Sequence, residues 1–289
     1  MIVDGGWSSV RITYELDIEF ATHDSLLISD MPTALITGAS AGIGATFAQE
    51  LASRQIDLVL VARSAEKLQQ LAARLQAQYQ IQVYVLVHDL TVPEAATAIH
   101  DTVKDKGLEI DLLINNAGFG DYGDFAERDG DRQVKMVQLN ILALVDLTHK
   151  FLPGMRQRRS GSIINLASTA AFQPIPYFAV YAASKAFVLN FSEALWAENR
   201  KYGVRIVAVC PGPTETKFFK EANFPKTFSE TISKNYTSPQ QVVREALQAL
   251  EKNRSSVIPG FTNKLSANAY RFLPRQALVS LVGKVFKQG

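Results

Sequence analysis

The sequence is poor in cysteine: Cys210 is the only one among 289 residues, so no intrachain disulfide can form. Such a chain suits a reducing compartment, and we expect a cytoplasmic protein. No apolar run approaches the ~18 residues of a membrane-spanning helix, and no basic segment precedes an apolar block as in a secretory signal. Charge of one sign is also missing, since 30 basic and 28 acidic residues nearly cancel, which argues against a nucleic-acid partner.

Sequence motifs of several common chemistries are absent as well. The histidines have no metal-ligand spacing and Cys210 has no partner in a C-x-x-C pair, so we expect no metal site. No G-x-S-x-G segment is present, so a hydrolase of that kind would lack its nucleophile. The histidines are His23, His88, His100 and His149.

From Met31 onward the chain alternates short apolar runs with helix-length segments. The runs carry Val, Ile and Leu at both odd and even positions, as strands buried on both faces require. Strands that alternate with helices predict βαβ units with right-handed crossovers. We therefore predict an α/β protein, a Rossmann-like doubly wound seven-stranded parallel sheet in a single domain. The candidate strands are Ala34–Thr37, Leu58–Ala62, Val83–His88, Leu112–Asn115, Ser162–Leu166, Val204–Cys210 and Ser256–Ile258.

We assign residues 31–260 to this domain and residues 1–30 to an N-terminal appendage. The appendage is acidic, and apolar and polar residues alternate in it from Val10 to Phe20. This pattern fits a strand added to a sheet edge. A second interpretation is that Met31 is the native start, because the first core strand begins almost directly after it.

Residues 261–289 form a basic tail that contains no acidic residue. Between Leu278 and Phe286 its apolar residues recur at helical spacing. One interpretation is an amphipathic helix that packs on the domain or covers the active site. The other is a basic amphipathic helix in contact with a membrane surface.

A glycine-rich turn follows the first predicted strand, with Gly38, Gly42 and Gly44 leading into a helix. Glycines let the backbone approach a ligand closely, and the helix N-terminus offers free N–H groups to a pyrophosphate. The spacing G-x-x-x-G-x-G differs from the G-x-G-x-x-G of the standard dinucleotide fingerprint, so a purely structural turn is the competing interpretation. Its position between a strand and a helix favours a dinucleotide site.

The end of the second predicted strand indicates which nucleotide the chain binds. Folds that bind NAD carry an acid there for the ribose 2′-hydroxyl. This chain has Arg63 followed by Ser64 instead. A guanidinium suits a 2′-phosphate, so we predict NADP(H) as the cofactor. Alternatively, Arg63 is a solvated residue at the start of a helix that Ser64 caps.

Three further residues predict hydride-transfer chemistry. Tyr181 and Lys185 share one helix face at spacing i, i+4, and Ser168 follows the fifth strand at the edge where such sheets bind ligands. Carbonyl reduction needs a proton donor for the developing alkoxide, and we expect Tyr181 to supply it. An ammonium about 4 Å away would favour the tyrosinate by about 4 kcal/mol, whereas burial acts in the opposite direction. We expect Lys185 to lower the pKa of Tyr181 and to hold the nicotinamide ribose, and Ser168 to hydrogen-bond the substrate oxygen.

With these motifs the chain resembles the short-chain dehydrogenase/reductase family. T-G-x-x-x-G-x-G, N-N-A-G, a serine before Y-x-x-x-K and a later P-G occur in the family's order, from about residue 31 to residue 260. The resemblance implies an NADP-binding catalytic domain with strand order 3-2-1-4-5-6-7, and a homodimer or homotetramer. One departure is Ala41, where many NADPH-preferring members have a basic residue, which leaves Arg63 as the main charge for the phosphate.

The resemblance also implies roles for individual matched residues. Asn140 would join the catalytic residues and organise a water between Lys185 and solvent. Asp89 would meet the adenine. The pyrophosphate turn would be lined by Gly38, Ser40, Ile43 and Gly44. The rest of the cofactor pocket would be shaped by Asn116, Gly118, Tyr181, Lys185, Pro211, Gly212 and Thr216.

The substrate is predicted less closely than the reaction. Three candidate pocket segments, Phe119–Phe125, Ala170–Phe178 and Glu215–Tyr236, hold many aromatic residues, which suit a hydrophobic carbonyl or alcohol but are also common in plain cores. A long-chain 3-oxoacyl reductase is an alternative. A protein that senses NADP(H) without turnover is another, although the complete Ser–Tyr–Lys set disfavours it. The aromatic residues are Phe172, Tyr177, Phe178, Phe218, Phe219 and Phe224.

Overall fold

The computed structural model describes residues 33–225, 227–228, 236–269 and 274–287, so the predicted appendage 1–30 lies outside the described residues. Its centre is a parallel sheet of strand order β3-β2-β1-β4-β5-β6-β7. Both the predicted class and the order that the resemblance implies are confirmed. The strands are β1 (Thr33–Thr37), β2 (Asp57–Ala62), β3 (Val83–Val87), β4 (Leu112–Asn115), β5 (Gly161–Leu166), β6 (Val204–Val209) and β7 (Ser256–Val257).

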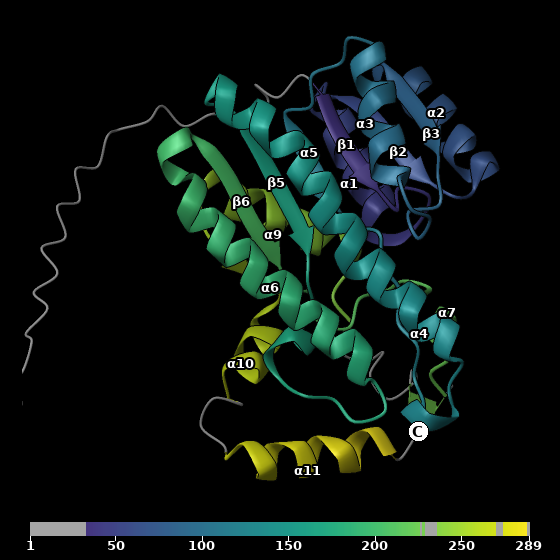
Figure 1. Ribbon diagram of the computed structural model, residues 1–289, viewed down its shortest axis with the longest axis vertical. Helices are drawn as coiled ribbons and strands as arrows, with labels where there is room; N and C mark the ends of the chain where they lie inside the picture. The colour runs from purple at the N-terminus through teal and green to yellow at the C-terminus, as the bar shows by residue number, and fades with distance from the viewer. Residues whose placement is uncertain (1–32, 226, 229–235, 270–273, 288–289) are drawn as a thin grey trace, which may run out of the picture.

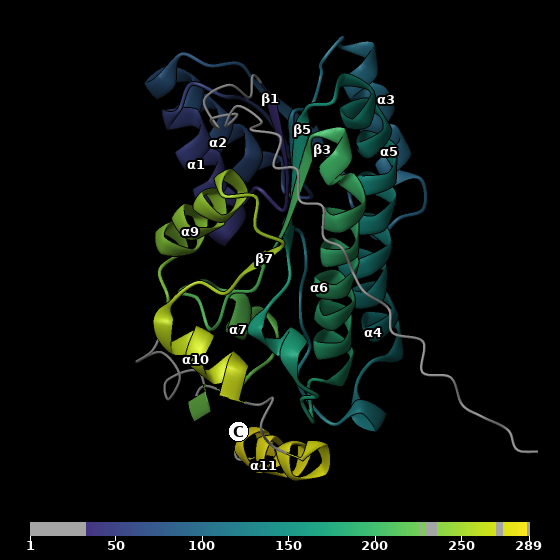
Figure 2. The same ribbon diagram turned by 90° about the vertical axis from the view of Figure 1, so that its left-hand side faces the viewer.

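The sheet is covered by helices on both faces, as Figure 2 shows edge-on. Every residue of β1 and of β5 is buried, because one face of the sheet meets one helical layer and the other face meets a second. The first layer is formed by α1 (Gly42–Ser53), α2 (Ala65–Tyr79) and α9 (Pro239–Glu251). The second layer is formed by α3 (Ala95–Asp105), α5 (Ala143–Arg158) and α6 (Ala179–Asn199).

Local sequence signals explain where these helices lie. In α2 the buried residues Leu68, Leu71, Ala72 and Leu75 recur at the spacing of one helical face. Helix α9 starts at Pro239, and the side chain of Ser238 accepts a hydrogen bond from the backbone N–H of Gln241. The helices therefore bury one apolar side each and leave the carboxyl ends of the strands open between the two layers.

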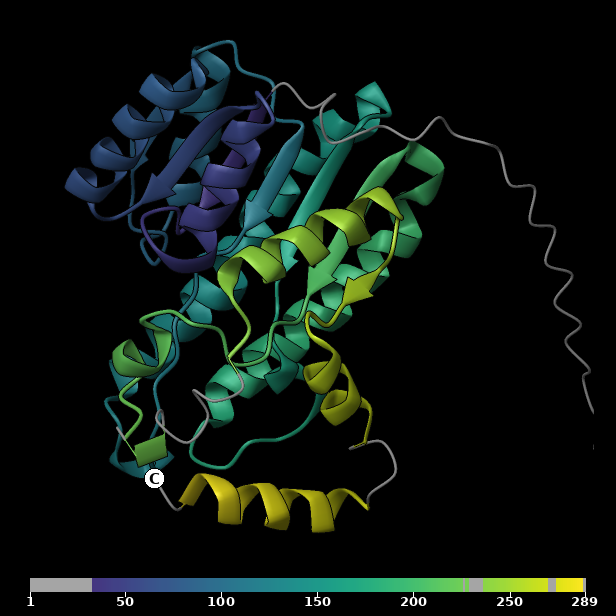
Figure 3. The same ribbon diagram turned by 180° about the vertical axis from the view of Figure 1, so that it is seen from behind.

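The remaining helices lie mostly beyond this edge of the sheet, where Figures 1 and 3 show α7, α10 and α11. Within the described part of the chain, no helix combines the length and apolarity needed to cross a bilayer. Helix α4 continues through a π-helical turn, η3, into α5. The bounds are α4 (Gly130–Val137), η3 (Gln138–Leu142), α7 (Phe218–Glu221), α10 (Phe261–Ala269), α11 (Arg275–Lys287) and the short turns η2 (Phe125–Glu127), η4 (Thr169–Phe172) and η5 (Arg200–Tyr202).

Candidate active site

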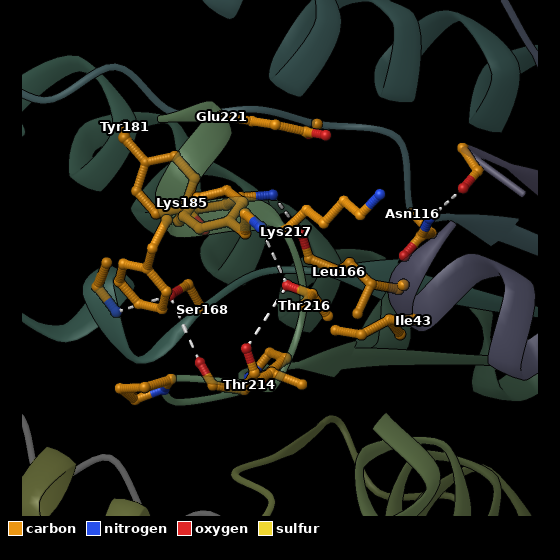
Figure 4. Close-up of a pocket in the computed structure, with 18 of the residues that line it drawn as sticks. Ile43, Asn116, Leu166, Ser168, Tyr181, Lys185, Thr214, Thr216, Lys217 and Glu221 are labelled. Carbon is orange, nitrogen blue, oxygen red and sulfur yellow. Dashed lines mark hydrogen bonds between the residues drawn. The ribbon is translucent and has the colours of Figure 1, made fainter. Parts of the chain in front are cut away.

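A cavity of about 1080 Å³ opens at the carboxyl edge of the sheet. Its lining comes from the glycine turn, the ends of β2 to β6, and the C-terminal helices. Figure 4 shows Ile43 and Asn116 toward one side, with Ser168 and Tyr181 toward the other. Of the predicted site residues, the lining includes Gly38, Ser40, Ile43, Arg63, Asp89, Asn116, Gly118, Ser168, Tyr181, Lys185, Pro211, Gly212 and Thr216.

The glycine turn has the geometry of a close backbone cradle. Gly38 has φ +65°, a left-handed value, and an added Cβ there would lie only 2.8 Å from Asn116 Nδ2. Asn116 fixes the turn by donating from Nδ2 to the Thr37 carbonyl oxygen at 2.8 Å. The residue before α1, Ala41, supplies no side-chain cap, so N–H groups at this helix N-terminus remain available for an anion.

Gly44 does not line the cavity. An added Cβ would collide with the carbonyl oxygen of Gly38, so Gly44 lies behind the turn and allows α1 to pack closely against it. Its predicted place in the pyrophosphate lining is therefore an indirect one: the glycine shapes the turn without facing the cavity.

A positively charged side chain, that of Arg63, lies at the carboxyl end of β2, next to the end of β3. Arg63 has a 75% exposed side chain, and its Nη1 lies 3.9 Å from Asp89 Oδ2. Burial alone would raise the pKa of Asp89, but hydrogen bonds from Thr91 and the charge of Arg63 outweigh it and lower that pKa. Lys67, in the first turns of α2, also lines the cavity. Sequence analysis missed Lys67, because Arg63 precedes the N-cap Ser64 and no helical spacing links the two side chains.

Tyr181, Lys185 and Ser168 come together on one wall of the cavity (Figure 4). Helix α6 carries Tyr181 and Lys185, which are 8% and 5% exposed. The Lys185 ammonium donates to the Leu166 carbonyl oxygen at 2.7 Å and lies 5.6 Å from the centre of the Tyr181 ring. Ser168, directly after β5, accepts a hydrogen bond from the Ala170 N–H at 3.1 Å. The predicted convergence of these three side chains is present.

The pKa of Tyr181 does not behave as expected from its amine neighbour. Burial raises it to about 12, and a hydrogen bond with Ser168 offsets only part of that rise. Burial also lowers the pKa of Lys185 to about 8. The expected lowering of the Tyr181 pKa is thus wrong, because desolvation of the phenolate outweighs the hydrogen bond with Ser168. At neutral pH Tyr181 is protonated, the form required of a proton donor.

Asn140 lies in the π-helical turn η3, outside the cavity lining, and is 1% exposed. Its side chain accepts from the Phe119 N–H at 3.1 Å and donates to the Phe119 carbonyl at 3.0 Å and to Ser184 Oγ at 3.1 Å. An added Cβ on Gly118 would lie 2.9 Å from Asn140 Oδ1 and 3.4 Å from Lys185 Nζ. The amide therefore sits beside Lys185 but is already engaged with the protein.

The other end of the cavity has an aromatic wall. Phe178 stacks on Tyr181 at 4.4 Å between ring centres, and Phe218 lies 5.3 Å from the Tyr181 ring. The lining here comes from two of the three predicted segments, 170–178 and 215–236; Phe119–Phe125 contributes none of it. Phe172 and Tyr177 do not line the cavity either. The aromatic lining residues are Phe178, Phe218, Phe219, Phe224, Phe228 and Phe286.

A few polar groups interrupt this wall and were missed by sequence analysis. Gln173 lines the cavity, and its Oε1 is buried without a hydrogen-bond partner in the structure. Lys217 and Glu221 line it as well. Among the described residues, no three His, Cys, Asp or Glu side chains gather as candidate metal ligands.

A buried carboxylate supports the aromatic wall from behind. The side chain of Asp121 is fully buried and accepts from Arg128 Nη2 at 2.6 Å, Arg132 Nε at 3.0 Å and Asn223 Nδ2 at 2.8 Å. Burial would raise its pKa, but these hydrogen bonds and the Arg128 charge lower it. The contacts tie the segment after β4 to α4 and to the segment after α7. No periodicity in the sequence signals this cluster, because its members come from separate loops and helices.

The doubly wound sheet and the cavity at its carboxyl edge define a dinucleotide-binding type of α/β protein. The chain belongs to the short-chain dehydrogenase family, whose profile matches residues 32–226. One relative, the very-long-chain 3-oxoacyl-CoA reductase of Anas platyrhynchos, is 33% identical over 265 residues, which cover 88% of this chain and 80% of the relative.

Solved structures agree with this membership. A short-chain dehydrogenase from Sphingobium yanoikuyae in complex with NADPH is 34% identical with a TM-score of 0.75, over 86% of this chain and 95% of that one. The bulky-bulky ketone specific alcohol dehydrogenase from Comamonas testosteroni is 31% identical with a TM-score of 0.70, over 86% and 94%. The resemblance drawn from the motifs is confirmed.

Proposed function

We propose that this chain is an NADP(H)-dependent oxidoreductase that transfers a hydride between the nicotinamide and a carbonyl or alcohol group of a hydrophobic small molecule. The observation that carries the proposal is the convergence of Ser168, Tyr181 and Lys185 on a cavity that also contains the glycine turn. Membership of the short-chain dehydrogenase family and the NADPH complex of the Sphingobium yanoikuyae neighbour support it.

The residues present fit this nucleotide. The turn at Gly38 leaves no room for a Cβ, and the uncapped start of α1 suits a pyrophosphate. Arg63 and Lys67 supply two positive charges where a 2′-phosphate would lie, and Asp89 would meet the adenine. When bound, NADP(H) supplies the hydride. The other residues that would hold it are Ser40, Ile43, Asn116, Gly118, Tyr181, Lys185, Pro211, Gly212 and Thr216, with Gly44 shaping the turn from behind.

In the reductive direction, Tyr181 donates its phenolic proton to the carbonyl oxygen as negative charge develops there. Ser168 steadies the same oxygen with a hydrogen bond. Lys185 places a positive charge beside the ring, which stabilises the tyrosinate left behind and holds the ribose. Asn140 acts as a positioning residue through Phe119 and Ser184, and its water link from Lys185 to solvent stays a prediction.

The aromatic wall supports an apolar substrate. It is continuous with Tyr181 through Phe178 and Phe218, so a chain or ring attached to the reacting carbonyl would lie against aromatic faces. The relative named very-long-chain 3-oxoacyl-CoA reductase supports a long-chain 3-oxoacyl thioester as one member of this substrate class. Gln173, whose buried Oε1 lacks a partner, would contact a polar group of such a substrate.

The oligomeric state of the protein is a further part of the proposal. We propose a homodimer or homotetramer, testable by sedimentation equilibrium. Cytoplasmic exposure is compatible with the single buried thiol, Cys210, which has no disulfide partner. The C-terminal helices would contact a membrane surface from the cytoplasm. The proposed domain spans residues 31–260 and is followed by a C-terminal segment, 261–289.

The test is turnover by the purified chain, followed by loss of NADPH absorbance with a panel of bulky ketones, steroid ketones and 3-oxoacyl thioesters of increasing length. We expect turnover that rises with apolar size, and lower kcat/KM with NADH. Ser168→Ala serves as the control variant, with NADPH binding retained and turnover reduced. Tight NADPH binding without turnover of any compound would instead favour the non-catalytic sensor.

A further inference from the structure

Helices α10 and α11 expose large apolar side chains. Phe261 and Leu265 on α10 are 82% and 64% exposed, and Leu281 and Val285 on α11 are 52% and 53% exposed. Each pair is spaced i, i+4, so each lies on a single helix face. The two C-terminal helices therefore present apolar surface that the other described residues leave uncovered.

This surface is not the result of a loosely attached helix. On its inner side α11 buries Leu278 and Val282, and Phe286 packs against Phe228 at 5.1 Å between ring centres. The Tyr122 hydroxyl donates to the Phe286 carbonyl oxygen. The apolar arc of α11 is thus wider than its contact with the domain, and Leu281 and Val285 lie on the part left outside.

On the two helices themselves the charge has one sign. In the described residues of the two helices, 261–269 and 275–287, there is no Asp or Glu. The cations are exposed. They are Lys264, Arg275, Lys284 and Lys287.

The same two helices line the outer part of the active-site cavity. Thr262, Asn263 and Ser266 of α10 contribute to its lining, together with Val285 and Phe286 of α11. Val285 is both a lining residue and half-exposed, so it sits at the rim of the cavity. Figures 1 and 3 show α11 across the end of the molecule farthest from β3, with α10 beside it. The exposed apolar surface therefore adjoins the aromatic end of the cavity.

We propose that this face of α10 and α11, defined by Phe261, Leu265, Leu281 and Val285, docks on a phospholipid bilayer that contains acidic lipids. The docked face brings the cavity rim to the apolar layer, from which a hydrophobic substrate enters; this step rests on the proposed function. Exposed apolar residues on helices whose described charged side chains are all cations match an acidic bilayer surface.

A second copy of the chain is a poorer occupant of this face. A two-fold contact brings the same patch of each subunit together. Arg275, Lys284 and Lys287 of one copy would then face those of the other, with no acidic residue in the described parts of either helix to offset them. An acidic lipid surface removes that repulsion.

The experiment is co-sedimentation of the full chain with phosphatidylcholine vesicles, with and without phosphatidylserine. We expect the chain to pellet with the acidic vesicles, and to do so at least tenfold less well with Phe261→Gln/Leu281→Gln or with Lys284→Glu/Lys287→Glu. The matched controls are Val87→Gln, on the distant edge strand β3, and Lys104→Glu on α3; both should pellet like the wild type. Circular dichroism and the urea midpoint verify that each variant is folded.

Two results would overturn the docking. One is a wild-type chain that stays in the supernatant with both vesicle types, and the other is equal pelleting of the wild type and both face variants. A change of sedimentation mass in the face variants without a change in pelleting would identify a contact between copies instead. Turnover of a short water-soluble ketone without vesicles should be unchanged in Phe261→Gln/Leu281→Gln; if the wild type shows no turnover yet pellets as expected, the proposed function fails while the docking stands.

Discussion

The two ends of the cavity are built in different ways. The nucleotide end consists of backbone and short polar side chains from neighbouring strand ends, around Gly38, Arg63 and Asn116. The substrate end consists of aromatic side chains from three segments distant in sequence, the last of which is Phe286 on α11. The first end is specified by local turns, and the second by tertiary packing. The nucleotide end can therefore be recognised in a sequence, whereas for the substrate end the sequence indicates aromatic segments without showing which of their residues line the cavity.

Tyr181, at the junction of the two ends, carries the largest expected effect. Tyr181→Phe removes the proton donor but keeps the ring that stacks on Phe178, so we expect kcat to fall by about 10³-fold, within the usual range for a general acid. NADPH binding, measured by fluorescence titration, should change less than about threefold, because the ring remains in place. Substantial residual turnover in Tyr181→Phe would mean that Tyr181 is not the proton donor.

A substitution of Asp121 tests whether the substrate end of the cavity depends on the buried hydrogen bonds that this carboxylate accepts. Asp121→Asn leaves Arg128 and Arg132 without their carboxylate, and we expect the free energy of unfolding to drop by about 2–3 kcal/mol, less than for a fully buried pair because both arginines are partly exposed. Because the folded-state pKa of Asp121 is lowered, its contribution is complete above the unfolded value of 3.8 and is lost as pH falls through the folded pKa.

Urea unfolding at pH 7 and at low pH measures this effect. The difference between Asp121→Asn and the wild type should shrink below about pH 4, where the carboxyl takes up a proton first in the unfolded chain and, at lower pH, in the folded protein. Asp101→Asn, an exposed position on α3, is the control and should cost little. Equal urea midpoints for Asp121→Asn and the wild type would mean that the Asp121 hydrogen bonds do not contribute to the stability of the fold.

Arg63 tests the nucleotide end alone. Arg63→Ala should weaken NADPH binding about tenfold and NADH binding hardly at all, because only the former offers a 2′-phosphate; the exposed guanidinium keeps the effect modest. Isothermal titration calorimetry with NADPH and with NADH measures the ratio of the two affinities. Arg74→Ala, on the exposed side of α2, is the matched control and should leave it unchanged. An equal loss of affinity for NADH would mean that Arg63 contacts a part of the nucleotide that NADH and NADPH have in common.

The smallest expected effect is a pH dependence. Because the pKa of Lys185 is lowered to about 8, reductive kcat/KM should fall about fourfold between pH 7 and pH 8.5, as the ammonium beside Tyr181 loses its proton. Lys185→Arg keeps a charge at these pH values, so its lower activity should show no such fall. A parallel fall in the variant would assign the titration to another group.

The comparison of the two ends also explains how far sequence reasoning reached. Of the predicted site residues, Gly44 and Asn140 alone do not line the cavity, because each acts one layer behind it. The segment Phe119–Phe125 was expected in the substrate pocket but packs behind it, held by Asp121 and by Tyr122, whose N–H donates to the Ala222 carbonyl at 2.8 Å. The places of Gly44 and of Phe119–Phe125 differ from expectation in depth in the fold rather than in position along the chain, whereas the expected role of Asn140 stays a prediction.

The sign of the Tyr181 pKa shift shows the same limit. Spacing i, i+4 placed Lys185 beside Tyr181, and the structure has them so. Only the packed structure determines that both groups are buried, and burial raises the pKa of one to about 12 and lowers that of the other to about 8. Coulomb attraction depends on a distance that helical periodicity gives, whereas desolvation depends on neighbours that it does not give.

The sequence by itself determined the alternation of strands and helices, the glycine turn, Arg63 at the end of β2, and the residues for proton transfer. Each depends on contacts within one strand–turn–helix unit, where a residue's neighbours along the chain are also its neighbours in space. Only the tertiary structure decided which aromatic residues line the cavity, the hydrogen bonds around Asp121, and which side of α11 faces outward. Those features join segments up to about 160 residues apart, as in the contact of Tyr122 with Phe286, and no local pattern encodes such pairings.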